Sequence, residues 1–439
     1  MVRSNIRKIT AFFLSLLVFS ACSINRATEA ILPTLTPVPT GTPTPIVTPT
    51  AEVVQGTVTI WHAWEEMQRS ALFRRITAFQ SIYPDVQFDV QYIPAIDLRN
   101  SFEAAMAESA GPTILIGPAE WGPAFFERGW VTNLSPLFSQ EIMTPLNSAA
   151  VATGQYKNNT ISMPLHIKGV VLYRNKSIIP NSPGTFDSLV TLAHTANQGT
   201  TVGAILERSF YYSAGHLYGL GGSLMDSEGQ PAFNADNYRA SLAWLNLLKS
   251  FEQAGPTEYL SDNDLKLFIA GRVGFIIEST EVMYSIAGEI DPLNLAIDPW
   301  PSYKDGHLAG FVQAESAYLT PKALEENSQV SRMFVEYLLS AESQATLAGV
   351  GYIPAIKPEV IEAKQQRIGD PFVSQAMAAL ENGAAYPSLP VISVYSTQMD
   401  VLLQAVLFQS ADPLSALKAA HTAIQNKLMS FTSPVTPTP

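Results

Sequence analysis

Aromatic and acidic residues follow four predicted strands of this chain, at the point where each strand ends. In chain order they are Trp61, His62, Trp64 and Glu65; Glu120 and Trp121; Glu207, Arg208, Phe210 and Tyr211; and Glu278 and Glu281. Ligands of α/β sheets bind at the carboxyl ends of the strands, so these side chains are candidates for a binding site. Aromatic rings cover the apolar faces of a ligand, and carboxylates accept hydrogen bonds from its hydroxyl groups.

Each of these residues also has a structural interpretation, which the sequence leaves open. One of the first two tryptophans is equally compatible with core packing, and so is Tyr211. Glu65, Glu278 and Glu281 are also compatible with solvated acids at the starts of helices, where the helix dipole stabilises them. By contrast, Trp130 lies between a glycine and a valine in a predicted turn, and we expect it in the core.

The motifs of several enzyme classes are absent from the sequence. It contains no GxSxG elbow, HExxH helix or Walker loop, and the glycines at 219–222 lack the rest of a dinucleotide fingerprint. The 6 histidines show no paired ligand spacing, and Cys22 is the only cysteine. We therefore expect no metal, no cofactor and no enzymatic activity. A secreted glycosidase with two paired carboxylates is the less favoured alternative.

Charge and length restrict the class of protein further. The chain has 439 residues and a formal net charge of -12, which argues against binding to nucleic acid or through a polybasic membrane patch. The part at 56–430 is too long for one core and suits two domains.

The pattern of predicted elements indicates an α/β fold. Strands are expected at 56–61, 86–92, 113–116, 202–206 and 273–277, and helices at 66–82, 101–109, 236–254, 329–339 and 412–429. Strands that alternate with helices at this spacing predict right-handed βαβ units and a mainly parallel sheet.

The N-terminus predicts export. Arg3, Arg7 and Lys8 precede an apolar run at 11–21 that is too short to span a bilayer. Phe19-Ser20-Ala21-Cys22 resembles a bacterial lipobox, so we expect a signal peptide at 1–21 and a lipid on Cys22; an ordinary secretory signal is the alternative. Residues 22–55 form a Thr/Pro-rich linker, and we expect a disordered tail at 431–439. Whether the linker is glycosylated stays open.

Several motifs, in order along the chain, resemble one family. They include Ile60-Trp61-His62-Ala63-Trp64, Gly117-Pro118-Ala119-Glu120-Trp121, the run at 163–176, Thr185-Phe186-Asp187-Ser188-Leu189, Gly221-Gly222-Ser223-Leu224-Met225-Asp226, Phe268-Ile269-Ala270-Gly271, Asp298-Pro299-Trp300-Pro301 and Gly351-Tyr352-Ile353-Pro354. The chain is similar over nearly all of 56–430 to extracellular solute-binding proteins of ABC importers, in the maltose-binding-protein branch. The run Glu278-Ser279-Thr280-Glu281 departs from that pattern, because the family commonly has a sugar-stacking aromatic there.

The resemblance implies a two-lobe periplasmic-binding-protein type II fold with three interlobe crossings. It implies an N-lobe at 56–165 plus 301–352 and a C-lobe at 166–300 plus 353–430. A carbohydrate would bind between the lobes, with hinge closure, and would pass to the transmembrane subunits of an ABC permease. The protein would be a monomer anchored at the outer face of the cell membrane. Residues near the crossings join the candidates: Lys168, Trp300, Gln313, Glu315, Tyr352 and Tyr395.

Two further uses of the same fold stay open at this point. The many acids predicted around the cleft are compatible with a polyamine, and a polyol phosphate is a second alternative ligand. A receptor that presents its ligand to a sensor kinase would share the fold and differ only in its partner.

Overall fold

The structure, a computed structural model, describes residues 54–259, 261–326 and 328–432. The predicted signal peptide, Cys22 and nearly all of the linker lie outside the described residues. Helix α18 (Pro413–Thr432) continues into the first two residues of the segment for which we predicted a disordered tail, so that boundary was wrong. Within the described residues, no helix is both long enough and apolar enough to cross a membrane.

One sheet of 11 strands carries the fold, and its first part is parallel. Strand β1 (Gly56–His62) lies between β2 (Val86–Tyr92) and β3 (Ile114–Pro118), and all three run in the same direction. Helices α1 (Glu66–Ile82) and α2 (Ala95–Ala107) connect them. Apolar residues alternate with others in β1 and β2, β3 is a short apolar run, and the connecting helices each bury one face, so the local sequence pattern specifies this βαβαβ unit.

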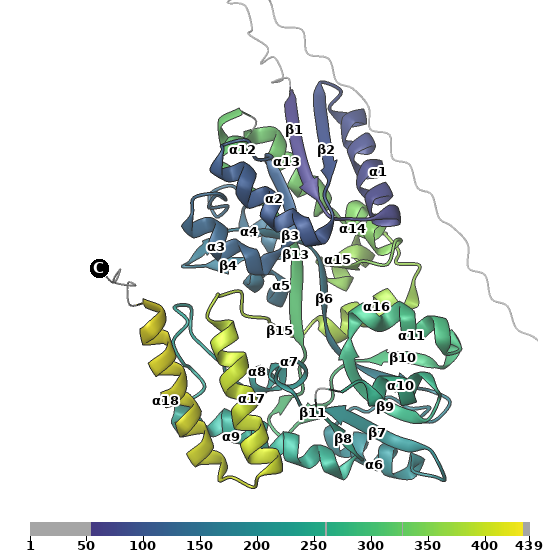
Figure 1. The fold of residues 1–439 in the computed structure, drawn as a ribbon. Helices are drawn as coiled ribbons and strands as arrows, with labels where there is room; N and C mark the ends of the chain where they lie inside the picture. Colours follow the sequence, from purple (N-terminus) through teal and green to yellow (C-terminus); the bar gives the residue numbers. More distant parts are fainter. Residues whose placement is uncertain (1–53, 260, 327, 433–439) are drawn as a thin grey trace, which may run out of the picture. The chain divides into compact units, whose positions relative to one another are not determined.

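Two long strands connect this part of the sheet to the rest. Strand β13 (Phe311–Leu319) is antiparallel to β3 and to β6 (Met163–Asn175), which in turn is antiparallel to β9 (Val273–Ser279). Figure 1 shows β6 and β13 running side by side through the middle of the molecule. We refer to these two strands as the crossing strands, and to the place where they pair as the crossing. The backbones approach so closely that a Cβ on Gly310 would lie 1.9 Å from the Val170 carbonyl oxygen. Glycine is therefore required at this crossing.

The far part of the sheet is built from shorter strands. Strand β7 (Val202–Glu207) is parallel to β9 and to β8 (Thr257–Glu258), while β10 (Leu295–Asp298) is antiparallel to β6. Strands β14 (Ile353–Pro354) and β15 (Ala384–Ala385) pair with β6 and β13. Between β6 and β7, α6 (Phe186–Ala196) starts with a capping box in which Thr185 and Ser188 exchange hydrogen bonds.

Helices pack on and beside this part of the sheet. Figure 1 shows α9 (Ala235–Ser250), α17 (Ile392–Phe408) and α18 together. The remaining helices of seven or more residues are α10 (Asn263–Ile269), α11 (Met283–Glu289), α13 (Ser328–Leu338), α14 (Ala341–Ala348) and α16 (Pro371–Leu380). Short helices near the site are η1 (Ala119–Trp121), α3 (Gly122–Glu127), α7 (Phe210–Ser213) and η3 (Thr280–Val282).

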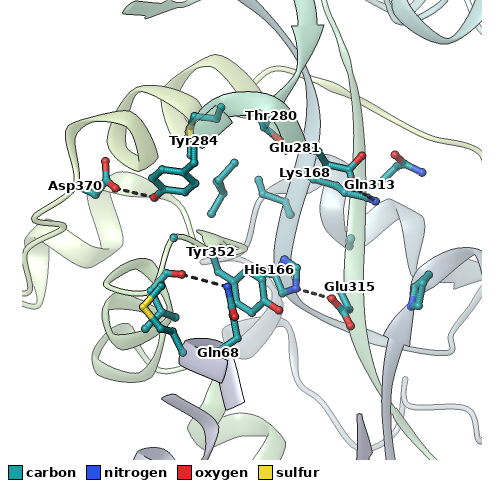
Figure 2. A pocket seen from close by; sticks show the side chains of 18 of the residues that line it. Gln68, His166, Lys168, Thr280, Glu281, Tyr284, Gln313, Glu315, Tyr352 and Asp370 are labelled. Carbon is teal, nitrogen blue, oxygen red and sulfur yellow. Dashed lines mark hydrogen bonds and ion pairs between the residues drawn. The ribbon is translucent and has the colours of Figure 1, made fainter. Parts of the chain in front are cut away.

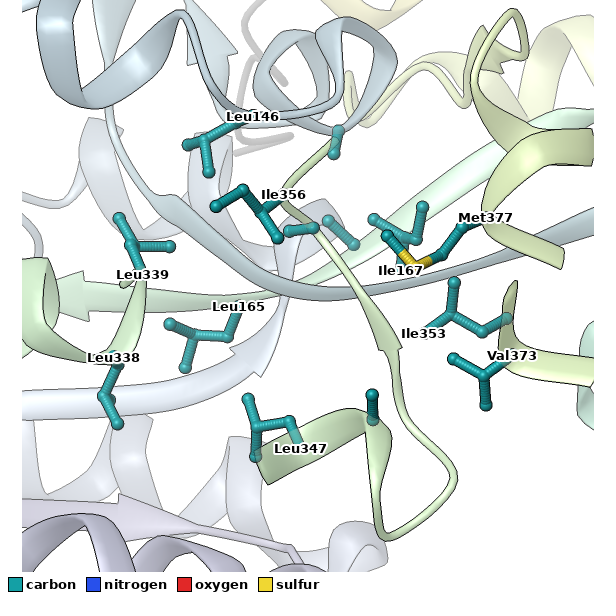
Figure 3. Packing of buried hydrophobic residues seen from close by; sticks show 14 of the residues in the cluster. Leu146, Leu165, Ile167, Leu338, Leu339, Leu347, Ile353, Ile356, Val373 and Met377 are labelled. Atoms are coloured by element: carbon teal, nitrogen blue, oxygen red, sulfur yellow. The ribbon is translucent and has the colours of Figure 1, made fainter. Parts of the chain in front are cut away.

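Buried apolar side chains pack around the crossing strands. Figure 3 shows side chains of β6 (Leu165 and Ile167), β14 (Ile353) and α16 (Val373 and Met377) that belong to one buried cluster. Each such side chain contributes about 1.5–3 kcal/mol when it is fully buried. This cluster continues along β6 to both parts of the sheet, and it therefore holds the crossing in place.

The predicted elements are confirmed, most of them with small shifts at their ends. Helix α1 has the predicted bounds, while α2 begins six residues before the predicted start. The periodicity did not predict that β6 and β13 run antiparallel to their neighbours, because it does not contain the direction of the strand that pairs with each one. The predicted bounds of the two lobes stay predictions.

Candidate functional site

A cavity of about 950 Å³ opens beside the crossing strands. Its walls combine residues after β3, on β6 and β13, after β9, and on the segments around α14 and α16 (Figure 2). The side chains that carry polar or aromatic groups are Gln68, Glu120, Trp121, His166, Lys168, Thr280, Glu281, Tyr284, Gln313, Glu315, Tyr352 and Asp370. The volume lies within the range of small-molecule sites.

The His166–Glu315 pair and the ring of Tyr352 form one wall. The Nε2 atom of His166 lies 2.7 Å from Oε2 of Glu315, and Tyr352 stacks on the imidazole with ring centroids 3.7 Å apart (Figure 2). Burial opposes ionisation of Glu315, but the hydrogen bond and charge of His166 outweigh it and lower the pKa of this carboxyl. The wall therefore presents a carboxylate beside an aromatic face, a combination that suits a polyol.

Residues after β9 form the opposite wall. The Lys168 ammonium lies 2.7 Å from the carboxylate of Glu281, and both side chains are partly exposed. Thr280 accepts a hydrogen bond at 3.1 Å from the backbone N–H of Gly169, on the crossing strand. The wall is thus tied directly to β6.

Gln313 connects the two sides through its amide group. Its carbonyl oxygen accepts a hydrogen bond of 2.9 Å from the Tyr211 hydroxyl, and its Nε2 donates to Glu120 at 2.6 Å. Because Tyr211 follows β7 and Glu120 follows β3, this amide bridges the two parts of the sheet.

Tyr284 supplies an aromatic face that the sequence analysis missed. It follows Glu281 by one helical turn, and its hydroxyl donates a 2.6 Å hydrogen bond to Asp370 (Figure 2). The ring packs against Gly351, where a Cβ would lie 2.8 Å from it and where φ is +88°. Glycine at 351 is therefore needed for the tyrosine to approach. The segment 278–281 contains no aromatic residue, and Tyr284, three residues later, places an aromatic ring on the cavity wall.

The structure brings part of the predicted site together. Of the predicted residues, the cavity is lined by Glu120, Trp121, Lys168, Glu281, Gln313, Glu315 and Tyr352. Tyr211 lies directly behind them through its bond to Gln313. Contact of these residues with a ligand stays a prediction.

The residues after β1 lie elsewhere, and here the expectation needs correction. His62 and Trp64 are buried. The backbone N–H of Trp64 donates to Nδ1 of His62, and the Trp64 indole packs against Tyr352. Trp61 packs in a separate cluster, and Glu65 is exposed and accepts a hydrogen bond from Tyr92. Trp64 therefore supports the cavity wall from behind.

The other candidates after β7, after β9 and at the crossings are also outside the cavity. Glu207, Arg208, Phe210, Glu278 and Tyr395 are buried, and Trp300 packs edge-on against His216. Their side chains are held within the protein: Glu278 accepts from Tyr212, Arg208 pairs with Glu252, and the Tyr395 hydroxyl donates to the Gly229 carbonyl. Position after a strand does not by itself decide which side of the sheet a side chain faces.

Besides Tyr284, the sequence analysis missed Met67, Gln68, His166, Thr280 and Asp370 on the cavity wall. A signal existed for His166, because it lies two residues before Lys168 on one strand and so shares its face. None existed for Asp370, which reaches the cavity only through the packing of α16.

Comparisons with known proteins identify the family. The model for bacterial extracellular solute-binding proteins matches residues 74–368. The chain belongs to this family. Within the described residues of this solute-binding protein, no three histidine, cysteine, aspartate or glutamate side chains are grouped to hold a metal ion.

Two curated relatives are similar to parts of the chain. A maltotriose-binding protein of Pyrococcus abyssi is 26% identical over 139 residues, which are 32% of this chain and 30% of that protein. A maltooligosaccharide ABC transporter solute-binding lipoprotein of Streptococcus pneumoniae is 25% identical over 282 residues, 60% of this chain and 65% of the relative. The matches thus span less than two thirds of these relatives.

A solved structure shows the same fold over nearly its whole length. The extracellular solute-binding protein of Staphylococcus aureus, in complex with maltose, aligns with a TM-score of 0.73 at 14% identity. The alignment covers 86% of this chain and 99% of that one. The fold is therefore the two-lobe, maltose-binding type of periplasmic binding protein, as predicted.

Proposed function

We propose that this solute-binding protein captures a carbohydrate in the cavity beside β6 and β13 and delivers it to the permease of an ABC importer. The names of the curated relatives support a saccharide, since both refer to maltose-type oligosaccharides. The proposed role is binding without turnover.

The observation that carries the proposal is the combination of side chains around one cavity. Tyr352, Trp121 and Tyr284 provide aromatic faces, while Glu315, Lys168, Glu281 and the other polar groups around them provide hydrogen-bond partners. A sugar has apolar C–H faces and a rim of hydroxyl groups, and it needs both kinds of contact at once. A pocket for an apolar ligand would not hold so many charged groups.

The crossing strands suggest how binding is coupled to movement. Glu120 and Glu281 come from different parts of the sheet, and β6 and β13 connect these parts beside the cavity. A ligand that contacts both parts favours the conformation in which both contacts are made. We infer hinge closure about the crossing, with Gln313 at its centre.

The location outside the cytoplasm follows from the family. The finer points are proposals: a lipid on Cys22 anchors the chain at the outer face of the membrane, the Thr/Pro linker separates the domain from the bilayer, and the protein acts as a monomer with the permease as its partner. Mass spectrometry of the protein purified from membranes tests the lipid directly.

Calorimetric titration and X-ray scattering test the function together. Maltotriose, glucose, spermidine and glycerol phosphate are titrated into the protein, and scattering is recorded with each compound at saturation. We expect micromolar binding of a saccharide, about -8 kcal/mol, and a smaller radius of gyration. Binding of spermidine or glycerol phosphate without any saccharide would refute the proposed ligand class, and an unchanged scattering profile at saturation would refute hinge closure. Release of shorter sugars would show catalysis instead.

A further inference from the structure

Four carboxylates line the cavity, and they differ in the charge of the groups that bind them within the protein: Glu120, Glu281, Glu315 and Asp370. Glu281 is matched by the ammonium of Lys168 at 2.7 Å, and Glu315 is paired with the imidazole of His166 at 2.7 Å. A carboxylate in a half-buried wall requires a hydrogen-bond donor or an opposite charge. The protein itself supplies such a partner to these two carboxylates.

Asp370 is stabilised by the end of a helix. One of its carboxylate oxygens accepts from the backbone N–H groups of Phe372 and Val373, at 2.8 and 3.4 Å, and the other accepts from the Tyr284 hydroxyl at 2.6 Å. The carboxylate is the N-cap of α16, where the helix dipole favours a negative charge. Three donors therefore already satisfy this group.

Glu120 is different. Its carboxylate accepts one hydrogen bond, of 2.6 Å, from the neutral amide of Gln313, and no lysine, arginine or histidine of the described chain lies within ion-pair distance of it. Cations on nearby elements are already paired, as Arg99 is with Glu103 and Lys157 with Glu127. The protein as a whole is acidic, with a net charge of -12.

The negative charges of Glu120 and Glu281 affect the pKa values of nearby tyrosines. Burial is the main reason that the pKa of Tyr211 lies far above its ordinary value, and the charges of Glu281 and Glu120 add to it. Burial and the charge of Glu120 also raise the pKa of Tyr386. Both tyrosines thus lie within electrostatic reach of Glu120.

We propose that the ligand of this cavity is a saccharide with a basic amine, and that Glu120 binds its ammonium group. This rests on the proposed function. A neutral sugar would offer Glu120 only hydroxyl donors, which satisfy its lone pairs but bring no opposite charge into the closed site. An ammonium would provide a charge-assisted hydrogen bond to the free lone pairs of Glu120. Lys168 does not oppose it strongly, because Glu281 compensates its charge.

Two matched pairs of probes test the amine. The first pair is 1-amino-1-deoxymaltotriitol and maltotriitol, which differ only in the amine; the second is the trimer of glucosamine and its fully N-acetylated form. Calorimetric titration of the full chain at 20 and 300 mM salt should show at least tenfold tighter binding of the amine in one pair. The preference should shrink at the higher salt concentration, since salt screens the attraction.

Two variants assign the effect to Glu120. Glu120→Gln keeps the size of the side chain and an oxygen for the Gln313 amide, so it should reduce the preference for the amine to about twofold or less. Glu127→Gln removes the same charge from α3 outside the cavity and should leave the preference unchanged.

Each other outcome overturns the inference. Equal binding of amine and neutral probe in both pairs would refute the amine but leave the proposed function standing. A preference that survives in Glu120→Gln would refute the assignment to this residue. If no saccharide binds, or if spermidine alone binds, the proposed function fails and the inference fails with it.

Discussion

Replacement of Asp264 by asparagine should make the protein more stable at neutral and alkaline pH. Asp264 is the second residue of α10 and is 1% exposed; one carboxylate oxygen accepts from the Leu265 N–H, and the other has no partner in the described structure. Three glutamates at the ends of strands lie near it. Glu207 of β7 is paired with Glu258 of β8, and Glu278 of β9 lies two residues beyond Ile276, which is paired with Ile205 of β7. Burial, followed by the charges of these glutamates, raises the pKa of Asp264 from 3.8 to about 7.

The sign of the pH dependence follows from this shift. Below about pH 4 the carboxyl is protonated in both the folded and the unfolded chain, and it carries no ionic penalty. Between about pH 4 and 7 the unfolded chain ionises first, so the free energy of unfolding falls as the pH rises. At about 1.4 kcal/mol for each pH unit, the complete penalty above pH 7 is about 4 kcal/mol.

Asparagine cannot ionise, and it keeps an oxygen for the Leu265 N–H. We expect the free energy of unfolding of Asp264→Asn to be about 2–4 kcal/mol higher than that of the wild type at pH 8. At pH 4 the two free energies should differ by less than about 1 kcal/mol. Urea denaturation followed by circular dichroism at pH 4, 6 and 8 measures the difference. The exposed neighbour Asp262, replaced in the same way, is the control and should change stability by less than about 0.5 kcal/mol at each pH. Parallel loss of stability in wild type and Asp264→Asn between pH 4 and 8 would refute the reasoning.

Three further substitutions test the site and its supports. Tyr284→Ala removes an aromatic wall and should weaken binding of the saccharide found in the titrations about tenfold, whereas Tyr284→Phe should stay within about threefold. Arg174→Met breaks the buried pair with Asp298, at 2.6 Å, and should cost about 3–5 kcal/mol in urea denaturation. Gly310→Ala places a Cβ against the Val170 carbonyl and should lower the melting temperature by several degrees or more, because the two crossing strands must separate.

Matched controls accompany the last two substitutions. Arg239 is 81% exposed, so its replacement by methionine should cost less than about 0.5 kcal/mol. A Cβ on Gly288 meets no neighbour within 4 Å, so Gly288→Ala in α11 should be neutral or stabilising. Equal effects at the exposed and the buried arginine, or at the two glycines, would contradict the roles given to Arg174 and Gly310. Equal losses for Tyr284→Ala and Tyr284→Phe would show that the hydroxyl, and not the ring, matters.

The local pattern of the chain predicted most of the elements. Alternation of Val, Phe, Val and Tyr at 86–92 gave β2 its bounds, and the apolar positions in 66–82 gave α1 its bounds. The reason is that period two and period 3.6 are properties of the strand and of the helix themselves. The resemblance to solute-binding proteins then supplied the two-lobe fold, which periodicity does not contain.

The composition of the cavity wall was only partly predictable. Glu120 and Trp121 line it because they follow β3 directly, as expected for the carboxyl end of a strand. Trp64 follows β1 in a similar way but lies behind Tyr352, because the turn after β1 directs it into the core. Both positions look alike in the sequence, since the direction of a side chain beyond a strand depends on the turn and on what packs against it.

The sequence by itself determined the α/β elements, the predicted export signal and the supply of aromatic and acidic residues at strand ends. Only the tertiary structure decided which of those residues share a cavity. Tyr284 and Asp370 are 86 positions apart, and they meet because α11 and the start of α16 pack at the same edge of the cavity. Such contacts depend on how distant segments bury their apolar faces together, and no local pattern records that.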